Sequence, residues 1–405
     1  MKIMHVFYTT LPSSTGGDIR SRDVVEAQLE VGLDVLAVSS PFQSPDETGA
    51  RVERFGGIAY YRSHNLSGGL RVSEKDQGLG VKIRKMLKLF SFADFLHGLG
   101  TRERPDVIHA HSTFFCAFAA HRVARRLRVP FVYEIRSLWE ERSVMKSPSI
   151  KTRAIAKFLR VVETQAMRMA DHVVVISEGL RDDVLSRGIP AERITLVANA
   201  VNLSRVSKDR ATVTTKAPSN WIFGYVGSLS DIEGLDLLIE AVGKLRQQGW
   251  HNELHIHGDG PAISDLRRLA VGIEGIEFYG RFHPEDVSKI YGSVDVVVNP
   301  RRRSELTDKV TPLKPLEAMA WRKPVITSSV AGMLELVRQG ETGFVFEADD
   351  AEALREALLQ VTISQDVLRI TESARHFVRD ERSWRSNGLM YKTLYAQLTR
   401  ADPTT

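Results

Sequence analysis

The chain has 405 residues, of which 43% are hydrophobic and 26% charged, with a formal net charge of +5 and one cysteine. This length predicts about two to three domains with cores of their own, and a single cysteine excludes an intramolecular disulfide framework, which favours a reducing, cytoplasmic setting. No apolar run approaches the roughly 18 residues of a membrane-spanning helix, and the run within residues 1–10 is too short for a signal peptide.

The charge is distributed unevenly along the chain. Residues 1–205 hold 30 basic and 22 acidic side chains, a balance of +8, whereas the remaining residues hold 25 and 28, a balance of −3. This asymmetry argues against a uniform nucleic-acid binder. It fits a protein whose first half faces an anionic partner, such as a bilayer or a diphosphate.

Strand-like apolar runs alternate with helical patterns in the first half, which is typical of parallel sheets built from strand–helix units. Gly16 and Gly17 follow the first predicted strand and precede a helix at 19–31. Strands are predicted at 3–8, 35–39, 58–61, 107–110, 131–135, 173–176 and 194–197. A glycine-rich segment, 63–80, predicts a mobile loop that leads into a basic amphipathic helix at 81–90.

The second half repeats this alternation after a segment, 203–218, whose lack of apolar periodicity predicts a linker. Strands are predicted at 221–227, 254–258, 276–279, 294–298, 325–327 and 343–346, and a last helix at about 384–398. The sequence therefore predicts an α/β protein with two doubly wound parallel-sheet domains, 1–205 and 206–384, and a C-terminal helix within 385–405 that crosses back to the first domain.

The most informative stretch is VTPLKPLEAMA at residues 310–320, which lies between predicted strands at 294–300 and 324–327. Ligands of parallel sheets bind where such a loop meets the start of the next helix. Thr311 suits the N-cap of that helix, and Pro312 fits its first position.

The start of this helix is suited to a phosphate group. The amides of Leu313 and Lys314 lack intrahelical partners there, and the Lys314 side chain adds a positive charge. Glu317, one turn further on, has the chemistry to accept hydrogen bonds from sugar hydroxyls. The alternative is a capped amphipathic helix whose glutamate only complements the helix dipole.

Basic residues crowd the loop before this helix, where Arg301, Arg302, Arg303 and Lys309 precede Lys314. The chain contains no D-x-D motif, which argues against Mg²⁺ or Mn²⁺ held by carboxylates at a diphosphate. Without a metal, guanidinium, ammonium and amide groups must neutralise a diphosphate. We therefore predict that the basic loop binds a diphosphate; the alternative is a solvated basic loop.

Two features of the first half indicate a ligand site. At Gly16 and Gly17, backbone amides can approach a phosphate closely, although a tight strand–helix turn would need the same residues. His109 and His111 alternate along a strand and so lie on one side of it, with His111 nearest the carboxyl end, where ligands bind. His111 is therefore the candidate catalytic residue; a structural histidine at the end of a strand is the alternative.

Short motifs are spread over nearly the whole chain. They are His-Ala-His at 109–111, Val-Ile-Ser-Glu-Gly-Leu at 175–180, Asn-Ala-Val-Asn at 199–202, Gly-Ser-Leu…Glu-Gly-Leu-Asp at 227–236, Gly-Asp-Gly-Pro at 258–261, Tyr-Gly-Arg-Phe at 279–282, Lys-Pro-Leu-Glu-Ala-Met-Ala at 314–320, Pro-Val-Ile at 324–326 and Gly-Glu-Thr-Gly-Phe at 340–344. Together they resemble the retaining glycosyltransferases of family 4, which have the GT-B fold of two Rossmann-like domains facing a central cleft. Two of the motifs, Tyr-Glu-Ile-Arg-Ser-Leu-Trp-Glu at 133–140 and Val-Thr-Pro-Leu-Lys-Pro at 310–315, look most like a subgroup associated with exosortase and exopolysaccharide gene clusters.

The resemblance implies roles for several residues. Glu317 matches the glutamate that binds the nucleotide ribose, and His111 matches the active-site histidine near the transferred sugar. Gly17 matches the loop glycine beside the diphosphate, and Arg281 lies near the nucleobase. By the same resemblance, the anomeric configuration of the sugar is retained and no cofactor is needed.

Two departures from the family pattern stand out. Lys309 stands eight residues before Glu317, where the family has a glutamate that contacts the donor sugar. Ser228 and Glu233 replace the arginine and lysine of the family's diphosphate site. We therefore expect phosphate neutralisation to have moved to the loop 301–314.

The expected function is transfer of a sugar from a nucleotide diphosphate sugar to a polysaccharide or lipid-linked acceptor. One alternative is a nucleotide-sugar epimerase of the same fold. Another is a non-catalytic nucleotide-sugar-binding protein, motivated by the changes at Lys309, Ser228 and Glu233. We expect a cytoplasmic location, peripheral at the inner face of the plasma membrane, and no nucleic-acid partner.

The membrane prediction rests on the basic helix at 81–90. Its basic side holds Lys82, Lys85 and Lys88, and its apolar side holds Ile83, Met86, Leu87 and Phe90. Such a helix can lie in the surface of an anionic bilayer with its apolar side inward. The alternative is a helix that packs on its own domain and keeps its basic side in water.

Overall fold

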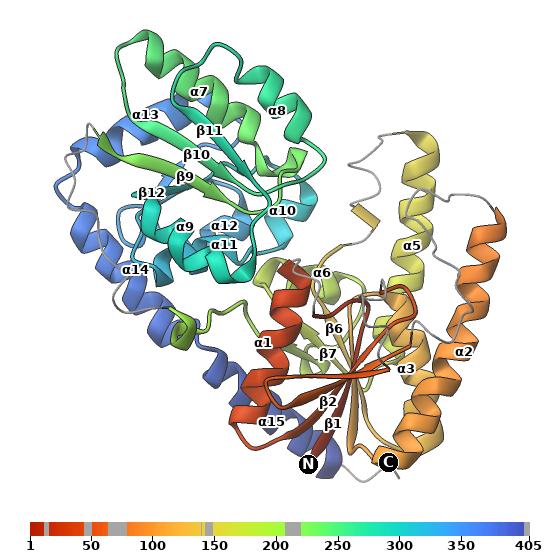
Figure 1. Ribbon diagram of the computed structural model, residues 1–405. Coiled ribbons are helices and arrows are strands. Elements are labelled where there is room, and N and C mark those ends of the chain that lie inside the picture. The colour runs from red at the N-terminus through yellow and green to blue at the C-terminus, as the bar shows by residue number, and fades with distance from the viewer. Residues whose placement is uncertain are drawn as a thin grey trace. The chain divides into compact units, whose positions relative to one another are not determined.

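The computed structural model describes residues 1–11, 16–43, 51–63, 79–138, 140–141, 149–206 and 220–400, and for residues 79–87 and 284 it describes the backbone only. The chain divides into two compact units, one formed by Met1–Ala198 with Trp384–Thr405 and the other by Asn199–Ser383. Each unit is built on its own sheet, with helices on both faces (Figure 1).

The sheet of the first unit has the strand order β3-β4-β2-β1-β5-β6-β7-β8. Its strands are β1 Lys2–Phe7, β2 Asp34–Ser39, β3 Val52–Phe55, β4 Ile58–Arg62, β5 Val107–His111, β6 Phe131–Ile135, β7 His172–Val175 and β8 Ile194–Leu196. All neighbours are parallel except β3 and β4. The direction of strand addition reverses between β1 and β5, so a crevice for ligands is expected at the carboxyl ends of these two strands.

Helices cover both faces of this sheet. They are α1 Gly16–Glu30, α2 Leu79–Glu103, α3 Phe114–Leu127, α5 Ile150–Met169, α6 Glu178–Ser186 and α15 Trp384–Arg400. Helices α2, α3 and α5 lie on one face, whereas α1 and α15 lie side by side on the other (Figure 1). Among the described residues, no helix is both long and apolar enough to cross a membrane.

The second unit has a six-stranded parallel sheet with the order β11-β10-β9-β12-β13-β14. Its strands are β9 Ile222–Val226, β10 Glu253–His257, β11 Ile276–Gly280, β12 Val296–Asn299, β13 Val325–Ser328 and β14 Phe344–Phe346. Its helices are α7 Leu235–Gln247, α8 Ile263–Leu269, α9 Val287–Ser293, α10 Glu305–Lys309, α11 Lys314–Ala320, α12 Ala331–Leu334, α13 Ala351–Ile363 and α14 Val367–Glu381. Here the order reverses between β9 and β12.

Each face of this second sheet has its own hydrophobic core. On one face Phe223 of β9 packs with Leu238 of α7 and Leu358 of α13. On the other face Leu316 of α11 packs with Phe377 of α14. A sheet covered on both faces explains why its strands read as short, nearly continuous apolar runs.

The structure confirms the predicted α/β class and two parallel-sheet domains, and every predicted strand is present to within two residues at either end. One strand, β3, was not predicted, because its sequence Val-Glu-Arg-Phe has no apolar alternation and is only partly buried. It pairs antiparallel with β4 through the two-residue turn Gly56-Gly57, where both residues have positive φ. Such a Gly-Gly turn is a sequence signal for a hairpin.

Two predictions around the basic loop were wrong. Residues 305–309 form helix α10 rather than loop, because Ser304 and Thr307 cap it reciprocally. The next helix, α11, begins at Lys314 and not at Pro312, and Leu313 occupies the N-cap. Thr311 does not cap it, since its carbonyl and hydroxyl oxygens both accept hydrogen bonds from Asn199 Nδ2.

The predicted basic helix is part of the longer α2, and its side chains at 81–87 lie outside the described residues, as does most of the segment 63–80. Lys88 is not on a solvated face: it is buried, with its Nζ 5.7 Å from the centre of the Phe42 ring. Phe90, in contrast, is 54% exposed. The predicted linker begins as a short turn of 3₁₀-helix at Leu203–Arg205, and residues 207–219 lie outside the described residues.

Candidate functional site

The carboxyl ends of β9 and β12 hold a buried cluster of charged side chains. Lys314 Nζ lies 2.8 Å from Glu233 Oε2 and 2.5 Å from Tyr225 Oη. Arg301 Nε lies 3.7 Å from the same carboxylate oxygen. Because this is where the strand order reverses, the cluster occupies the position at which parallel α/β sheets bind ligands.

Two cations of the cluster, Lys314 and Arg301, face the single carboxylate of Glu233. Burial opposes ionisation of Glu233, but Lys314 and Arg301 outweigh it and lower the pKa of the carboxyl. Burial also lowers the pKa of Lys314, against the attraction of Glu233. Two cations therefore share one carboxylate, and such cations suit the binding of an anionic ligand group.

Gly227 makes room for this ion pair. A Cβ on Gly227 would lie 2.4 Å from Lys314 Cε, and the residue has φ +150°. The lysine side chain thus runs directly over the backbone that follows β9. A larger residue would push it off Glu233, so this glycine has a defined structural role.

Glu317 is half-buried in the first turn of α11, with Oε2 3.5 Å from Tyr291 Oη. Burial raises the pKa of Tyr291, so its hydroxyl stays a neutral donor. Leu313 and Lys314 begin the same helix, whereas Arg281 follows β11 and is exposed. The structure thus brings Glu317, Lys314 and Arg301 together near the reversal point of the second sheet.

The rest of the basic loop is paired with acids of its own unit. Arg302 forms an ion pair with Asp236, Arg303 Nη2 lies 3.1 Å from Glu347 Oε1, and Lys309 Nζ lies 2.5 Å from Glu305 Oε1. These pairs are partly exposed, so each contributes little to stability and can exchange. A ligand phosphate would compete with carboxylates for Arg303 and Lys309.

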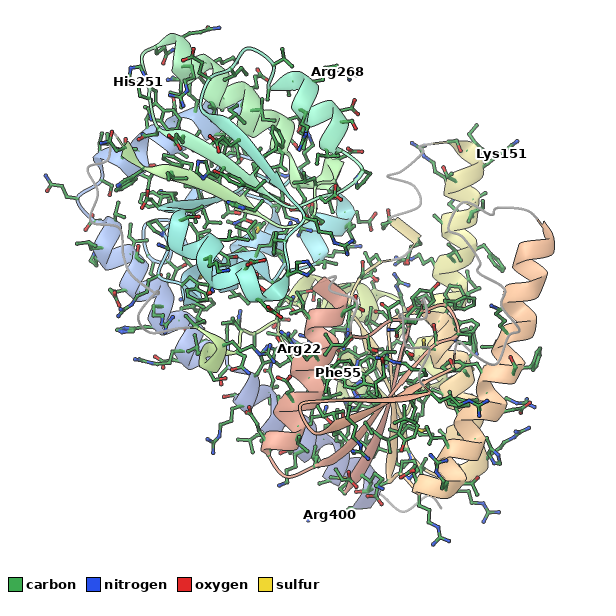
Figure 2. The ribbon with its side chains drawn as sticks, viewed as in Figure 1. Arg22, Phe55, Lys151, His251, Arg268 and Arg400 are labelled. Atoms are coloured by element: carbon green, nitrogen blue, oxygen red, sulfur yellow. The ribbon has the colours of Figure 1, made fainter. Side chains whose placement is uncertain are left out.

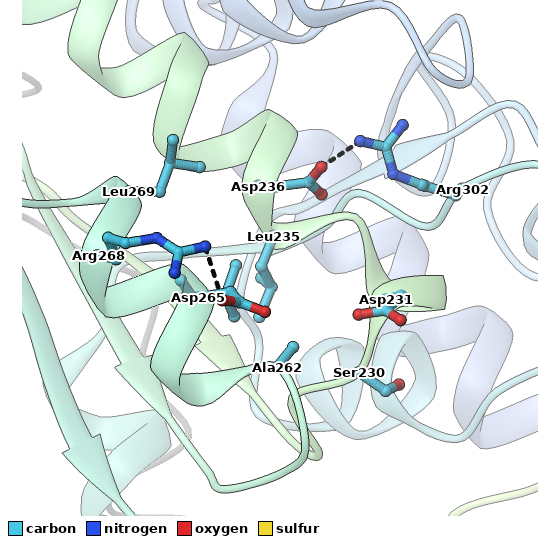
Figure 3. A pocket seen from close by; sticks show the side chains of 10 residues that line it. Ser230, Asp231, Leu235, Asp236, Ala262, Asp265, Arg268, Leu269 and Arg302 are labelled. Atoms are coloured by element: carbon cyan, nitrogen blue, oxygen red, sulfur yellow. Dashed lines mark hydrogen bonds and ion pairs between the residues drawn. The ribbon is translucent and has the colours of Figure 1, made fainter. Parts of the chain in front are cut away.

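A pocket of about 500 Å³ lies elsewhere in this unit, between α7 and α8 (Figure 3). Its lining residues are Ser230, Asp231, Leu235, Asp236, Ala262, Asp265, Leu266, Arg268, Leu269 and Arg302. Arg302 and Arg268 pair with Asp236 and Asp265 of the same pocket. Of the predicted basic loop, Arg302 lines this pocket, whereas Lys314, Glu233 and Glu317 do not, so the pocket does not coincide with the candidate site.

In the first unit, three buried histidines stack at the carboxyl ends of β1 and β5. His5, His109 and His111 have ring centroids 4.0 to 5.3 Å apart. His5 was not singled out from the sequence, although it is in register with His109 on the neighbouring strand. Only the sheet order shows that β1 and β5 are adjacent.

Hydrogen bonds fix the tautomers of this cluster. Arg136 donates from Nη2 to His111 Nδ1 at 2.7 Å, so the ring proton of His111 sits on Nε2, 2.8 Å from His5 Nδ1. His5 in turn donates from Nε2 to Gln28 Oε1 at 2.9 Å. Both ring nitrogens of His111 are therefore engaged.

The C-terminal helix completes the same chain of hydrogen bonds. Gln28 donates from Nε2 to Tyr395 Oη at 3.0 Å, and Tyr395 donates to His109 Nδ1 at 2.7 Å. The remaining proton of His109, on Nε2, then faces Glu134 Oε2 at 3.7 Å. Helix α15 thus positions side chains next to the candidate catalytic histidine.

All three histidines are held neutral. Burial lowers the pKa of His5 to about 4 and lowers the pKa of His109 and His111 well below the ordinary value. The Arg136 guanidinium further disfavours a proton on His111. His111 is therefore a hydrogen-bonding group and not a cation at neutral pH.

Glu134 is the anionic centre of this network. Its Oε1 accepts from Arg136 Nε at 2.7 Å and from Arg20 Nε at 3.1 Å, and Tyr391 donates to its Oε2. Burial opposes its ionisation, but the two guanidinium groups outweigh it and hold the pKa well below its usual range. Glu134 and Arg136 lie within the motif at 133–140, and no role was predicted for either of them from the sequence.

Arg136 also links His111 to the glycines at the start of α1. Its Nη1 donates to the Gly17 carbonyl oxygen at 3.2 Å. A Cβ on Gly16 would meet no described atom within 4 Å, so internal packing does not require a glycine there. Open space at Gly16 is compatible with close approach of a ligand.

The nitrogens of His5, His109 and His111 lie within 4.8 Å of one another, a spacing that could hold a metal ion. Metal-bound histidines normally donate their second N–H to a carboxylate or carbonyl. Here the second nitrogen of His111 faces an arginine donor instead. The donor set therefore fits a metal poorly and fits a hydrogen-bonded network well.

The chain matches two protein families. Residues 15–200 match the family described as "Glycosyl transferase 4-like domain", and residues 220–363 match "Glycosyl transferases group 1". The two matches take in most of the chain and both candidate site regions.

Curated relatives include enzymes that transfer different sugars. The chain is 29% identical to alpha-D-kanosaminyltransferase of Streptomyces kanamyceticus over 60% of its own length and 64% of the relative's. It is 26% identical to a sulfoquinovosyl transferase of Arabidopsis thaliana, over 70% of its length and 55% of the relative's. The chain thus spans less than two thirds of either protein. It is 25% identical to the D-inositol 3-phosphate glycosyltransferase of Corynebacterium efficiens, over 73% and 72% of the two lengths.

Solved structures share the fold over nearly the whole chain. The sucrose-phosphate synthase of Thermosynechococcus elongatus has a TM-score of 0.77 at 20% identity, covering 99% of this chain and 100% of its own. HepE of Anabaena, solved in complex with UDP-glucose, has a TM-score of 0.69 at 17% identity, covering 98% and 100%. At sequence identities this low, the similarity to these structures shows the fold alone.

Proposed function

Because the chain belongs to the glycosyltransferases of the GT-B type, we propose that it moves a sugar from a nucleotide diphosphate sugar to a polysaccharide or lipid-linked acceptor, with retention of configuration. The observation that carries this proposal is the cluster of Lys314, Arg301 and Glu233 at the reversal point of the second sheet, one helical turn from Glu317. HepE, of similar fold, was solved with UDP-glucose, which supports this class of donor.

Each group of the cluster has a chemical task. Glu317 accepts hydrogen bonds from the ribose hydroxyls, and Lys314 with Arg301 binds the diphosphate. Arg303 and Lys309 add positive charge when they exchange their carboxylate partners for the diphosphate. The Leu313 backbone lies at the phosphate end of the nucleotide, and Arg281 lies at its base end. The two cations that face Glu233, Lys314 and Arg301, are the physical reason for an anionic ligand.

This arrangement calls for no metal ion. Lys314 and Arg301, which share the carboxylate of Glu233, provide fixed positive charge for a diphosphate. Electrostatic stabilisation of the leaving group by fixed cations costs no reorganisation during the reaction. We assign the protein to metal-independent transfer on this basis.

His111 is assigned to the transferred sugar, with Gly16 and Gly17 beside the diphosphate. A neutral, oriented imidazole can exchange its bond to His5 for one to a sugar hydroxyl as the transition state forms. The leaving diphosphate then takes the acceptor proton on the same face of the sugar. The protein contributes orientation and charge stabilisation.

The anomeric outcome is tested by following the reaction with NMR. A thermal-shift panel of nucleotides and nucleotide sugars first identifies the donor, since tight binding to the folded state raises Tm. The product formed from an α-linked donor should carry an α linkage. A β-linked product would overturn retention, and donor conversion without acceptor would indicate the epimerase.

We propose exopolysaccharide synthesis as the biological setting, on the strength of the sequence motifs at 133–140 and 310–315. The non-catalytic alternative is weakened by the relatives, which are described as sugar transferases. Tight binding of the donor without transfer of sugar to any acceptor tested would favour the non-catalytic alternative.

A further inference from the structure

Helix α5 has two apolar faces, and among the described residues only one of these faces is packed against the protein. Ala156, Ala166 and Met167 are buried on the face toward the first unit. Ile150 is 88% exposed, Phe158 66% and Val161 68%. Large apolar side chains in such numbers on one helix are unusual for a face that only meets water.

The exposed apolar residues form a stripe. At about 100° per residue, positions 150, 154, 158 and 161 fall within roughly 80° of one another, on the side opposite the buried residues. Ala154 lies between Ile150 and Phe158 in this stripe and is also exposed. The helix therefore has one apolar face that is buried against its own unit and a second apolar face, on the opposite side, that is exposed.

Basic residues flank this stripe on both sides. Lys151, Arg153 and Lys157 are exposed, and Arg160 pairs with Asp183 on α6. Residues 150–162 contain no acidic side chain. Lys151 stands at the exposed start of the helix in Figure 2.

The stripe begins at the edge of the sheet that carries the candidate site. Helix α5 follows β6, so its first turn lies toward the carboxyl ends of the parallel strands, where His111 ends β5. Helix α3 lies between α2 and α5 on this face of the sheet (Figure 1). The exposed Phe90 of α2 belongs to the same helical layer.

We propose that the outer face of α5, formed by Ile150, Ala154, Phe158 and Val161 with its flanking lysines and arginine, docks on an anionic lipid bilayer. The apolar stripe would enter the boundary between headgroups and acyl chains, and the basic flanks would contact anionic headgroups. This deepens the proposed function and rests on its lipid-linked acceptor. It also moves the predicted membrane contact from α2 to α5.

A bilayer suits this face better than a protein partner. The stripe holds four apolar side chains, whereas a stable protein–protein interface takes roughly 20–30 residues from each partner. The charged side chains along the stripe are all positive, which complements anionic lipid. A second copy of the chain would place basic flanks against basic flanks.

The test is sedimentation of the purified full-length chain with vesicles of phosphatidylcholine alone or mixed with phosphatidylglycerol, at low and high salt. The wild type should partition onto the mixed vesicles on the order of tenfold more strongly, and salt should reduce this. Phe158→Ser with Val161→Ser should lower partitioning about tenfold, and Lys151→Glu with Lys157→Glu should abolish the preference for anionic lipid. The matched control is Ile363→Ser with Leu368→Ser, which removes exposed apolar residues of the second unit and should change nothing.

Three outcomes would overturn the proposal: no vesicle binding, equal binding to both vesicle types, or a Phe158/Val161 variant that binds like wild type. A concentration-dependent dimer that the same variant abolishes, seen by light scattering, would also overturn it in favour of a second copy. Nucleotide binding by the same variants separates the two claims. If vesicle binding behaves as expected while no nucleotide binds, the proposed function fails and the membrane face stands.

Discussion

Lys314 and Glu233 form an ion pair of 2.8 Å between the first residue of α11 and the loop that follows β9. By the family resemblance, position 233 would hold a lysine. Here it holds a glutamate, and the lysine comes from α11 instead. The positive charge at the reversal point of the sheet is thus kept, and Arg301 adds a second cation.

Replacing Lys314 by methionine should weaken nucleoside diphosphate binding by about 2 kcal/mol and leave nucleoside binding nearly unchanged, because only the phosphates lose a charge-assisted hydrogen bond. Isothermal titration calorimetry with both ligands measures the difference. Lys289→Met, at an exposed lysine of α9 paired with Asp286, is the matched control. Equal weakening of both ligands would mean that Lys314 does not contact the phosphates.

Gly227→Ala should lower the free energy of unfolding by about 2 kcal/mol, because the residue has φ +150° and its Cβ would lie 2.4 Å from Lys314 Cε. The displaced lysine should also weaken diphosphate binding. Gly292→Ala in α9 is the control: a Cβ there meets no described atom within 4 Å, and a helical position tolerates alanine. Equal urea midpoints for the two variants would contradict the close approach of Lys314.

Low pH should reduce the free energy of unfolding of the first unit through protonation of His5. Burial lowers its pKa from 6.5 to about 4, so the folded state binds fewer protons than the unfolded chain between these pH values. The free energy of unfolding should therefore fall by about 3 kcal/mol from this residue as the pH drops from 7 to 4.

Glu163 acts in the opposite direction, because burial raises its pKa to about 7 and its contribution is lost as the pH rises from 4.5 to 7. The test is therefore the difference between wild type and His5→Gln in urea titrations across this range. That difference should shrink by about 3 kcal/mol toward pH 4. The same substitution at exposed His251 (Figure 2) should keep the wild-type pH dependence, and a parallel His5→Gln curve would disprove the linkage.

Sugar transfer should survive EDTA, because Lys314 and Arg301 supply the charge at the diphosphate. Activity measured before and after chelation, and after adding back Mg²⁺, Mn²⁺ or Zn²⁺, provides the comparison. Complete loss that a metal restores would refute metal independence. If zinc alone restored activity, His5, His109 and His111 would be the candidate ligands of the metal.

Periodicity was enough to predict the parallel strands, because buried parallel strands read as short apolar runs, but it missed the antiparallel edge strand β3. It was not enough for α10, a five-residue helix in a basic run whose only signal is the reciprocal cap of Ser304 and Thr307. Nor could it place the start of α11, since Thr311 bonds to Asn199 across 112 residues of chain instead of capping the helix. Local propensity gives no information about such distant partners.

The sequence singles out individual residues of the candidate site but not the network that connects them. Lys314, Glu233 and His111 stood out from the sequence, yet the pairing of the first two depends on the lysine crossing over Gly227. His5 and Arg136 were missed because their link to His111 depends on the adjacency of β1, β5 and β6. Charged residues inside strand motifs, such as Glu134 in β6, are the signal that could have found them.

The most direct test of the donor site is calorimetric titration of wild type and Glu317→Ala with the nucleotide that stabilises the wild type most. Glu317 lies in the first turn of α11, beside the cations assigned to the diphosphate, and its removal should cost about 2–4 kcal/mol of binding if it holds the ribose. Circular dichroism checks that the variant is folded. Unchanged nucleotide affinity in a folded Glu317→Ala protein would contradict the assignment of this site to a nucleotide sugar.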